Sequence, residues 1–247
     1  MDPIVAIPVV RESVVAILRY RMTRPQIVKK GKTRPAQFNV GWGSGFCIVA
    51  NQYIVTAYHV LNGGQPRNVT DKFLAFVVPG NGDSAHHFPV IGFPLELPDL
   101  DLAILEIGPC ATAGIQLPAI PITFAQQQDG SRVLTVGFPN PEVSSINIDP
   151  QGNYVGGQFF LKSHANEGIL SAQYQIPPVP VYEFNVGWHH GESGGPVVRL
   201  NDPIAAFTIM QQYRNINSPH GIVAGPHRGC ALSAIQVDIQ RLGAQIV

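Results

Sequence analysis

The hexapeptide Gly191–Pro196, which reads Gly-Glu-Ser-Gly-Gly-Pro, restricts this chain of 247 residues more than any other stretch. It places Ser193 among three glycines. Glycine adopts backbone conformations that other residues avoid and leaves room for a second molecule beside the main chain. On such a turn the N–H groups of Gly191 and Ser193 can point at one oxygen atom, which indicates a nucleophilic serine beside an oxyanion hole. A glycine-rich hairpin turn with an incidental serine is the alternative interpretation.

A nucleophilic serine needs a base and a carboxylate, and the chain offers both. His59 follows an apolar segment, and Asp101 directly precedes the apolar run Leu102–Leu105. A neutral imidazole takes the serine proton, while a carboxylate holds the imidazole in the required tautomer. We interpret Asp99, two residues earlier, as a loop carboxylate. The predicted catalytic residues are therefore His59, Asp101 and Ser193, in the chain order of the chymotrypsin type of triad.

Several segments together resemble the trypsin-like serine peptidases of the chymotrypsin clan, and most of all the bacterial HtrA-like protease domain. These segments are Gly43–Phe46, Thr56–His59, Asp101–Leu105, Gly137–Pro139 and Gly191–Pro196. The resemblance runs from about residue 13 to the C-terminus and includes no PDZ-like segment. It implies an all-β fold of two six-stranded antiparallel β-barrels with a C-terminal α-helix and an active site between the barrels. We expect residues 1–115 to hold an N-terminal arm and the first barrel, and residues 116–247 the second barrel and the helix.

The sequence pattern places several elements directly. Residues 13–20 are rich in β-branched side chains and predict the first strand. Residues 140–157 are rich in Pro, Asn, Asp and Gly and predict a long surface loop. Residues 231–235 predict the last strand, after which apolar residues recur at helical spacing and predict a terminal amphipathic helix. Those apolar residues are Ile235, Ile239, Leu242 and Ile246.

The charge is balanced, with 16 Lys and Arg residues against 16 Asp and Glu residues. This balance gives no sign of a nucleic-acid or anionic-membrane partner, and no apolar run has the length of a membrane span. One basic cluster stands out in residues 21–39. We expect a solvated loop there; docking of an acidic partner is the alternative.

The cysteines are few and odd in number: Cys47, Cys110 and Cys230. In secreted relatives a disulfide usually closes the histidine loop, and its second cysteine directly follows the catalytic histidine. Here Val60 stands at that position. The pattern favours reduced thiols and a reducing compartment. The N-terminal apolar stretch is interrupted by Arg11 and Glu12, which is not typical of a signal peptide. We therefore expect a cytoplasmic protein, or a secreted or periplasmic one if a leader was removed.

The resemblance also places the substrate pocket. Gly187, six residues before Ser193, stands at the pocket floor, where relatives that cleave after Arg or Lys carry an aspartate. The other predicted substrate-binding residues are His190, Thr208, Met210 and Gly229. Burying a cation without a counter-charge is costly, so we expect an uncharged, apolar P1 residue. A glycine needed only for a turn is the alternative.

Activation and partners follow from the same resemblance. Zymogens of this type are activated when a new N-terminus pairs with the aspartate before the serine, and Glu192 stands at that position. We expect the loop 187–195 to be ordered by substrate or by an activating or targeting protein partner. Adjacent histidines such as His189 and His190 lack acidic or Cys ligands at usual spacings, so no metal and no other cofactor is expected. A catalytically silent peptide-binding protein, an esterase and a virus-encoded processing enzyme stay open as alternatives.

Overall fold

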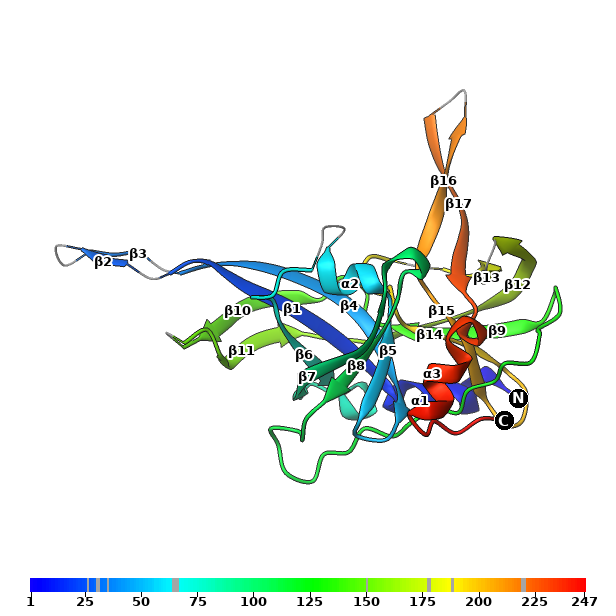
Figure 1. The fold of residues 1–247 in the computed structure, drawn as a ribbon, viewed down its shortest axis with the longest axis horizontal. Helices are drawn as coiled ribbons and strands as arrows, with labels where there is room; N and C mark the ends of the chain where they lie inside the picture. The colour runs from blue at the N-terminus through cyan, green and yellow to red at the C-terminus, as the bar shows by residue number, and fades with distance from the viewer. Residues whose placement is uncertain are drawn as a thin grey trace.

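The computed structural model describes residues 1–25, 27–29, 32–34, 36–63, 67–149, 151–176, 179–187, 189–218 and 221–247. The first half of the chain forms a closed antiparallel barrel with the strand order β1-β4-β5-β8-β7-β6 (Figure 1). Its strands are β1 (Val14–Arg24), β4 (Gln37–Val49), β5 (Tyr53–Thr56), β6 (Lys72–Val77), β7 (His86–Leu97) and β8 (Leu102–Ile107). The predicted first barrel is thus confirmed.

The barrel forms because its strands carry apolar residues on the face that closes inward. Residues 14–18 of β1 are buried without exception, and Ala16 pairs with both neighbouring strands, opposite Ser44 on β4 and Phe76 on β6. Phe46, Phe76 and Phe88 are almost wholly buried and belong to the hydrophobic core.

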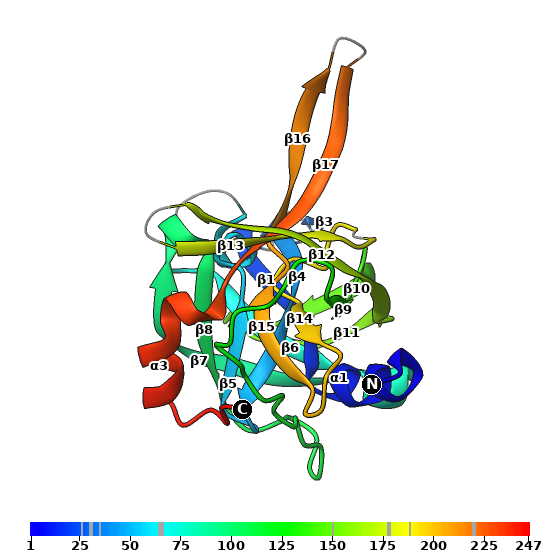
Figure 2. The same ribbon diagram turned by 90° about the vertical axis from the view of Figure 1, so that its right-hand side faces the viewer.

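The second half is a curled sheet of seven strands in the order β15-β14-β9-β12-β13-β17-β16 (Figure 2). Its strands are β9 (Arg132–Gly137), β12 (His164–Ile176), β13 (Val179–Asn185), β14 (Pro196–Arg199), β15 (Ala205–Ile209), β16 (Gln212–Ser218) and β17 (Gly221–Cys230). A closed barrel of six strands was expected. Among the described residues, β15 instead meets the end of β17 at an isolated bridge between Thr208 and Ala231, and the N–H of Gln211 donates to the carbonyl of Arg228 at 3.1 Å. Beyond this point β16 pairs with β17 in a ribbon that rises away from the body.

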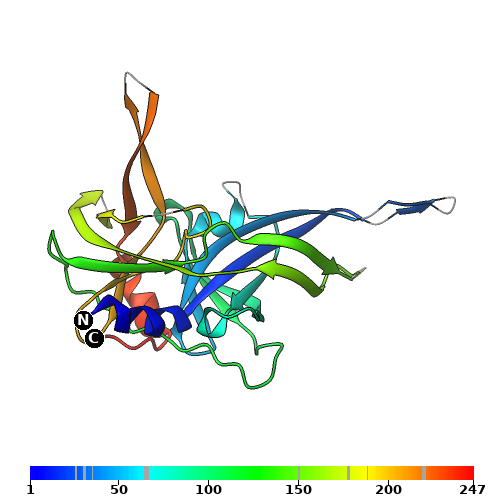
Figure 3. The same ribbon diagram turned by 180° about the vertical axis from the view of Figure 1, so that it is seen from behind.

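The prediction of a loop over residues 140–157 was wrong. The chain forms a hairpin of β10 (Glu142–Ile148) and β11 (Tyr154–Phe160) that lies along the first barrel (Figure 3). Aromatic rings hold it there: the Phe159 ring lies 5.7 Å from that of Trp42 and 5.1 Å from that of Phe76. Such contacts with residues about 80 or more positions earlier compensate for the polar, turn-rich composition of the hairpin.

The helices are short. α1 (Pro3–Glu12) begins at Asp2, whose side chain accepts the N–H of Ile4 at 2.9 Å, and it buries Ala6 and Val10. The predicted strand 231–235 was wrong, because Leu232–Ile235 form the 3-10 helix η3. The predicted terminal helix is present as α3 (Gln236–Arg241). It is shorter than its apolar spacing suggested, since Gly243 adopts a left-handed conformation just beyond it.

The prediction of a loop over residues 21–39 was wrong, because most of the described residues in this range lie in strands. β1 and β4 continue beyond the barrel, and β2 (Ile27–Lys29) and β3 (Lys32–Arg34) extend the same two-stranded ribbon outward. Figures 1 and 3 show this ribbon projecting far from the body. The prediction failed because Lys, Arg and Pro are disfavoured in strands, although an isolated ribbon does not need an apolar face.

Candidate active site

His59 and Asp101 are joined by two hydrogen bonds. His59 lies in α2 (Tyr58–Asn62), a short helix that ends at a left-handed Gly63. Asp101 follows the 3-10 helix η2 (Pro98–Leu100) and is itself left-handed, with φ 51°. Its Oδ1 accepts the main-chain N–H of His59 at 2.8 Å, and its Oδ2 lies 2.8 Å from His59 Nδ1. A proton on Nδ1 is thereby held by the carboxylate, which leaves Nε2 able to accept another.

A third contact fixes this pair, since the main-chain N–H of Tyr58 donates to the carbonyl of Asp101 at 3.1 Å. The His59 side chain keeps 40% of its surface exposed and that of Asp101 29%. The imidazole is therefore oriented by the protein and still reachable by a bound molecule. The contacts of Asp101 also agree with its choice over Asp99, which lies exposed in η2.

The serine loop, Gly191–Pro196, packs against the first barrel at Gly194. A Cβ atom on Gly194 would lie 2.2 Å from the Ser44 carbonyl oxygen and 2.9 Å from Ala57 N. Both Gly191 (φ 98°) and Gly194 (φ 87°) are left-handed. Only glycine satisfies both conditions without strain. This close approach brings Ser193 beside the segment that leads into His59.

Ser193 itself is buried, with 6% of its surface exposed. Its Oγ donates to the carbonyl oxygen of Gln211 at 3.5 Å. Within the described residues no hydrogen bond joins Ser193 to His59. The structure thus brings the three predicted catalytic residues to one junction, with the serine hydroxyl turned toward Gln211.

Two main-chain donors lie free at the same loop. Among the described residues, the N–H groups of Gly191 and Ser193 have no acceptor, whereas those of Glu192, Gly194 and Gly195 each have one. The carbonyl of His190 accepts the N–H of Asn140 at 2.7 Å. In a planar trans peptide the carbonyl and the next N–H point in opposite directions, so the Gly191 N–H points away from Asn140. Two free main-chain donors on one loop are what an oxyanion hole requires.

The Glu192 side chain holds the serine loop through two hydrogen bonds. It is almost wholly buried; its Oε2 accepts the main-chain N–H of His189 at 2.7 Å and its Oε1 accepts from Asn166 Nδ2 at 3.2 Å. Burial raises the pKa of the Glu192 carboxyl, although these two donors and the nearby His189 oppose the shift. The loop is therefore held by hydrogen bonds of its own.

Two positioning residues were missed by sequence reasoning. Ser44 Oγ donates to the Gly191 carbonyl at 2.7 Å and accepts the N–H of Phe138 at 2.9 Å, which ties the serine loop to β4. Gln211 Nε2 donates to the carbonyls of Leu100 and Asp101 at 2.7 and 2.8 Å. The one available signal for Gln211 was a polar residue two positions after the apolar strand β15.

The predicted pocket residues are less uniform. Gly187 is exposed and does not adopt a left-handed conformation, so its backbone does not require glycine. Thr208 and Met210 are fully buried, with Thr208 Oγ1 donating to the carbonyl of Cys230 at 2.6 Å. A Cβ on Gly229 would lie 1.9 Å from the Ile209 carbonyl oxygen. Glycine at 229 thus allows β17 to approach β15.

His190, the remaining predicted pocket residue, is exposed beside the serine loop. Three surface cavities, of about 210, 280 and 340 Å³, are lined by other residues. Within the described ranges no group of three or more His, Cys, Asp or Glu side chains is arranged to hold a metal ion. The helices found in the same ranges are all too short or too polar to cross a membrane.

Comparisons with known proteins agree with this geometry. A model of the trypsin-like peptidase domain matches residues 43–202, which include His59, Asp101 and Ser193. No curated protein matches the chain. Among solved structures, a serine-to-alanine form of the HtrA-type protease AlgW, with a tripeptide, is similar in fold, with a TM-score of 0.61 and 16% identity. The similarity covers 98% of this chain and 64% of the AlgW chain.

The chain therefore spans less than two thirds of the length of that protease, and identity at this level is informative about fold alone. The family model, in contrast, covers more than half of the chain. It includes His59 and Asp101 from the first half and Ser193 from the second. The closed barrel, the curled second sheet and the C-terminal helix are the architecture of a chymotrypsin-like fold. This chain belongs to the trypsin-like peptidase family.

Proposed function

We propose that the chain is a serine endopeptidase in which Ser193, His59 and Asp101 act together. The observation that carries the proposal is the Asp101 carboxylate bonded to His59 Nδ1 at 2.8 Å, beside a glycine-flanked serine. For reaction, the Ser193 hydroxyl turns about its Cα–Cβ bond from Gln211 toward His59 Nε2. The hydrogen bond between a catalytic nucleophile and its base is often long or absent before substrate binds and shortens afterwards.

The chemistry then follows in two steps. Ser193 Oγ attacks the scissile carbonyl as His59 Nε2 takes its proton, and the oxyanion accepts the N–H groups of Gly191 and Ser193. Protonated His59 gives the proton to the leaving amine, and the C–N bond breaks to leave an acyl-enzyme. Water then attacks the acyl carbonyl as His59 takes its proton, the bond from the acyl carbon to Ser193 Oγ breaks, and His59 returns the proton to Oγ to release the acid. Asp101 stays ionised and stabilises the imidazolium.

An uncharged, apolar P1 residue is part of the proposal. Gly187 carries no side chain at the position of the floor, and Glu192 in the serine loop already accepts the His189 N–H and the Asn166 amide. A P1 cation would have no free counter-charge there and would lose its hydration. Cleavage of a peptide library should favour Leu, Val, Ala or Phe at P1. Faster cleavage after Arg or Lys would contradict this specificity.

Labelling with a fluorophosphonate probe tests the catalytic assignment. Wild type should be labelled, Ser193→Ala should not, and a matched Ser233→Ala variant should label like wild type. The Ser193→Ala variant should keep its fold and lose turnover by several orders of magnitude. Labelling or cleavage by Ser193→Ala at the wild-type rate would refute the role of Ser193.

A partner-gated or silent peptide-binding protein is the second candidate. It is favoured by one observation, that Ser193 Oγ donates to Gln211 O rather than to His59. If the hydroxyl is held there, the isolated chain should bind peptides without being labelled by the probe. Isothermal titration with a non-cleavable peptide, followed by labelling of the same sample, separates the two candidates.

A further inference from the structure

The ribbon that projects from the first barrel has one cationic face. In the β2–β3 register, Lys29 lies opposite Lys32 and Ile27 opposite Arg34. Directly opposed residues share a face of an antiparallel ribbon, and so do residues two apart. Lys29, Lys32 and Arg34 therefore lie on one face, and all three are exposed. We call these three residues the cationic face.

The cationic face has no acidic partner in the part of the chain that the structure describes. None of the ion pairs found there includes Lys29, Lys32 or Arg34. Two like charges directly opposite each other also disfavour the ribbon. A ribbon selected for its own stability would place a carboxylate opposite one of these lysines.

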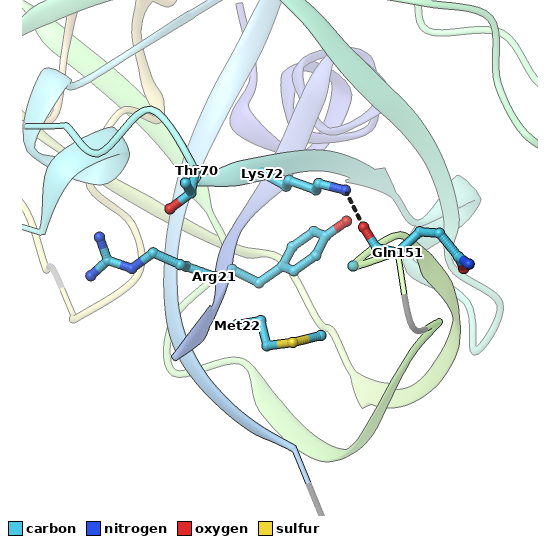
Figure 4. Close-up of a pocket in the computed structure, with 7 residues that line it drawn as sticks. Arg21, Met22, Thr70, Lys72 and Gln151 are labelled. Atoms are coloured by element: carbon cyan, nitrogen blue, oxygen red, sulfur yellow. Dashed lines mark hydrogen bonds between the residues drawn. The ribbon is translucent and has the colours of Figure 1, made fainter. Parts of the chain in front are cut away.

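Cations at the base of the ribbon behave differently. Arg21 and Lys72 line a cavity of about 210 Å³, and Figure 4 shows Lys72 reaching toward the β10–β11 hairpin. Arg21 lies 3.5 Å from Asp71, and Lys72 Nζ donates to Asn153 Oδ1 at 2.8 Å. At the base of the ribbon, Arg21 and Lys72 thus have polar partners within the protein, whereas no described carboxylate pairs with the cationic face.

Positive and negative side chains are unevenly distributed along the whole sequence, with the cations concentrated around the ribbon. Residues 13–70 contain eight of the 16 Lys and Arg residues and none of the 16 Asp and Glu residues. The other residues therefore carry eight cations against 16 acids, a net charge of −8. A long polyanion reaching the ribbon would be repelled by the body of the molecule.

We propose that the cationic face docks an extended acidic segment of a partner protein. β2 and β3 form a two-stranded sheet, so each leaves one edge free for main-chain pairing with a third strand. Carboxylates on alternate residues of that strand would face the cations. Residues 21–37 contain no aromatic side chain on which a nucleobase could stack. The proposal does not depend on the catalytic role of Ser193.

Fluorescence anisotropy with a labelled peptide of alternating Glu and Thr, which offers the proposed protease no apolar P1 residue, tests the proposal. A double variant, Lys29→Gln with Lys32→Gln, should bind about fivefold more weakly than wild type, the loss expected from two exposed ion pairs. The matched control neutralises Arg132 and Arg241, which are also exposed at 57% and 65%, and should bind like wild type. Raising the salt from about 50 to about 200 mM should weaken wild-type binding.

Circular dichroism checks that both double variants are folded. We expect the Lys29/Lys32 variant to fold, because its changes lie in the ribbon outside the body of the molecule. Equal affinity of wild type and the Lys29/Lys32 variant would overturn the proposal, because any binding would then lie elsewhere, including the substrate cleft. Equal affinity for a peptide with Gln in place of Glu would also overturn it. So would tighter binding of a double-stranded oligonucleotide than of the acidic peptide.

Discussion

Replacing Gln211 with alanine removes three hydrogen bonds where the two lobes meet. Its Nε2 donates to the carbonyls of Leu100 and Asp101 at 2.7 and 2.8 Å, and its Oε1 accepts the N–H of Cys230 at 2.6 Å. Only 7% of the Gln211 surface is exposed, so water does not readily take over these contacts. The change removes the Gln211 partner of the Leu100 carbonyl and of the Cys230 N–H, whereas the Asp101 carbonyl keeps the N–H of Tyr58.

The expected loss follows from these three contacts. Each contributes about 1 kcal/mol net, so Gln211→Ala should lower the free energy of unfolding by about 3 kcal/mol. For a chain of this size that corresponds to roughly 6–12 °C in Tm. Asp101 keeps its contacts with Tyr58 and His59 but loses one side of its support. We therefore expect kcat to fall about tenfold, with a smaller change in KM.

Urea denaturation and steady-state cleavage of an apolar-P1 peptide measure both effects. Gln126→Ala is the control, because Gln126 donates to Gln173 at 3.0 Å on the surface; its change should stay within about 0.5 kcal/mol. Gln211→Glu adds a second test. A carboxylate facing two carbonyls can donate only when protonated, so that variant should gain stability as the pH falls. If Gln211→Ala matched wild type in both stability and kcat, Gln211 would have no positioning role.

Three further outcomes are expected. Burial raises the pKa of Glu192, so native protein binds that proton more tightly than unfolded chain. The free energy of unfolding of wild type should therefore decline as the pH rises from the unfolded-state pKa of Glu192 to its folded-state pKa. Denaturation at several pH values should show this decline in wild type and not in Glu192→Gln. Parallel curves for the two proteins would refute it. Phe159→Ala should cost about 2–3 kcal/mol by denaturation, since it removes the ring holding the hairpin; a loss below about 0.5 kcal/mol would contradict that packing. Burial raises the pKa of the Cys47 and Cys230 thiols to about 11 and about 12, so a thiol reagent near pH 8 should modify Cys110 alone until denaturant is added.

The positions of the candidate catalytic residues could be inferred from the sequence because their requirements are local. Gly191 and Gly194 adopt left-handed conformations that glycine tolerates best. Asp101 stands at the start of an apolar strand whose residues 102–105 are all buried. Local composition and order along the chain were therefore enough to indicate a nucleophilic serine, a base and a carboxylate. The same holds for the first barrel, whose strands carry recognisable apolar runs.

What only the tertiary structure decided depends on residues far apart in the chain. The β10–β11 hairpin has the composition of a loop and becomes a hairpin by packing on Trp42 and Phe76. The second sheet has seven strands because the β16–β17 ribbon leaves it instead of closing a barrel. Gln211 supports Asp101 from 110 positions away. The physical reason is common to all three: a hydrogen bond or a ring contact between distant segments has no signature in either segment alone, and it exists only once the chain has brought the partners together.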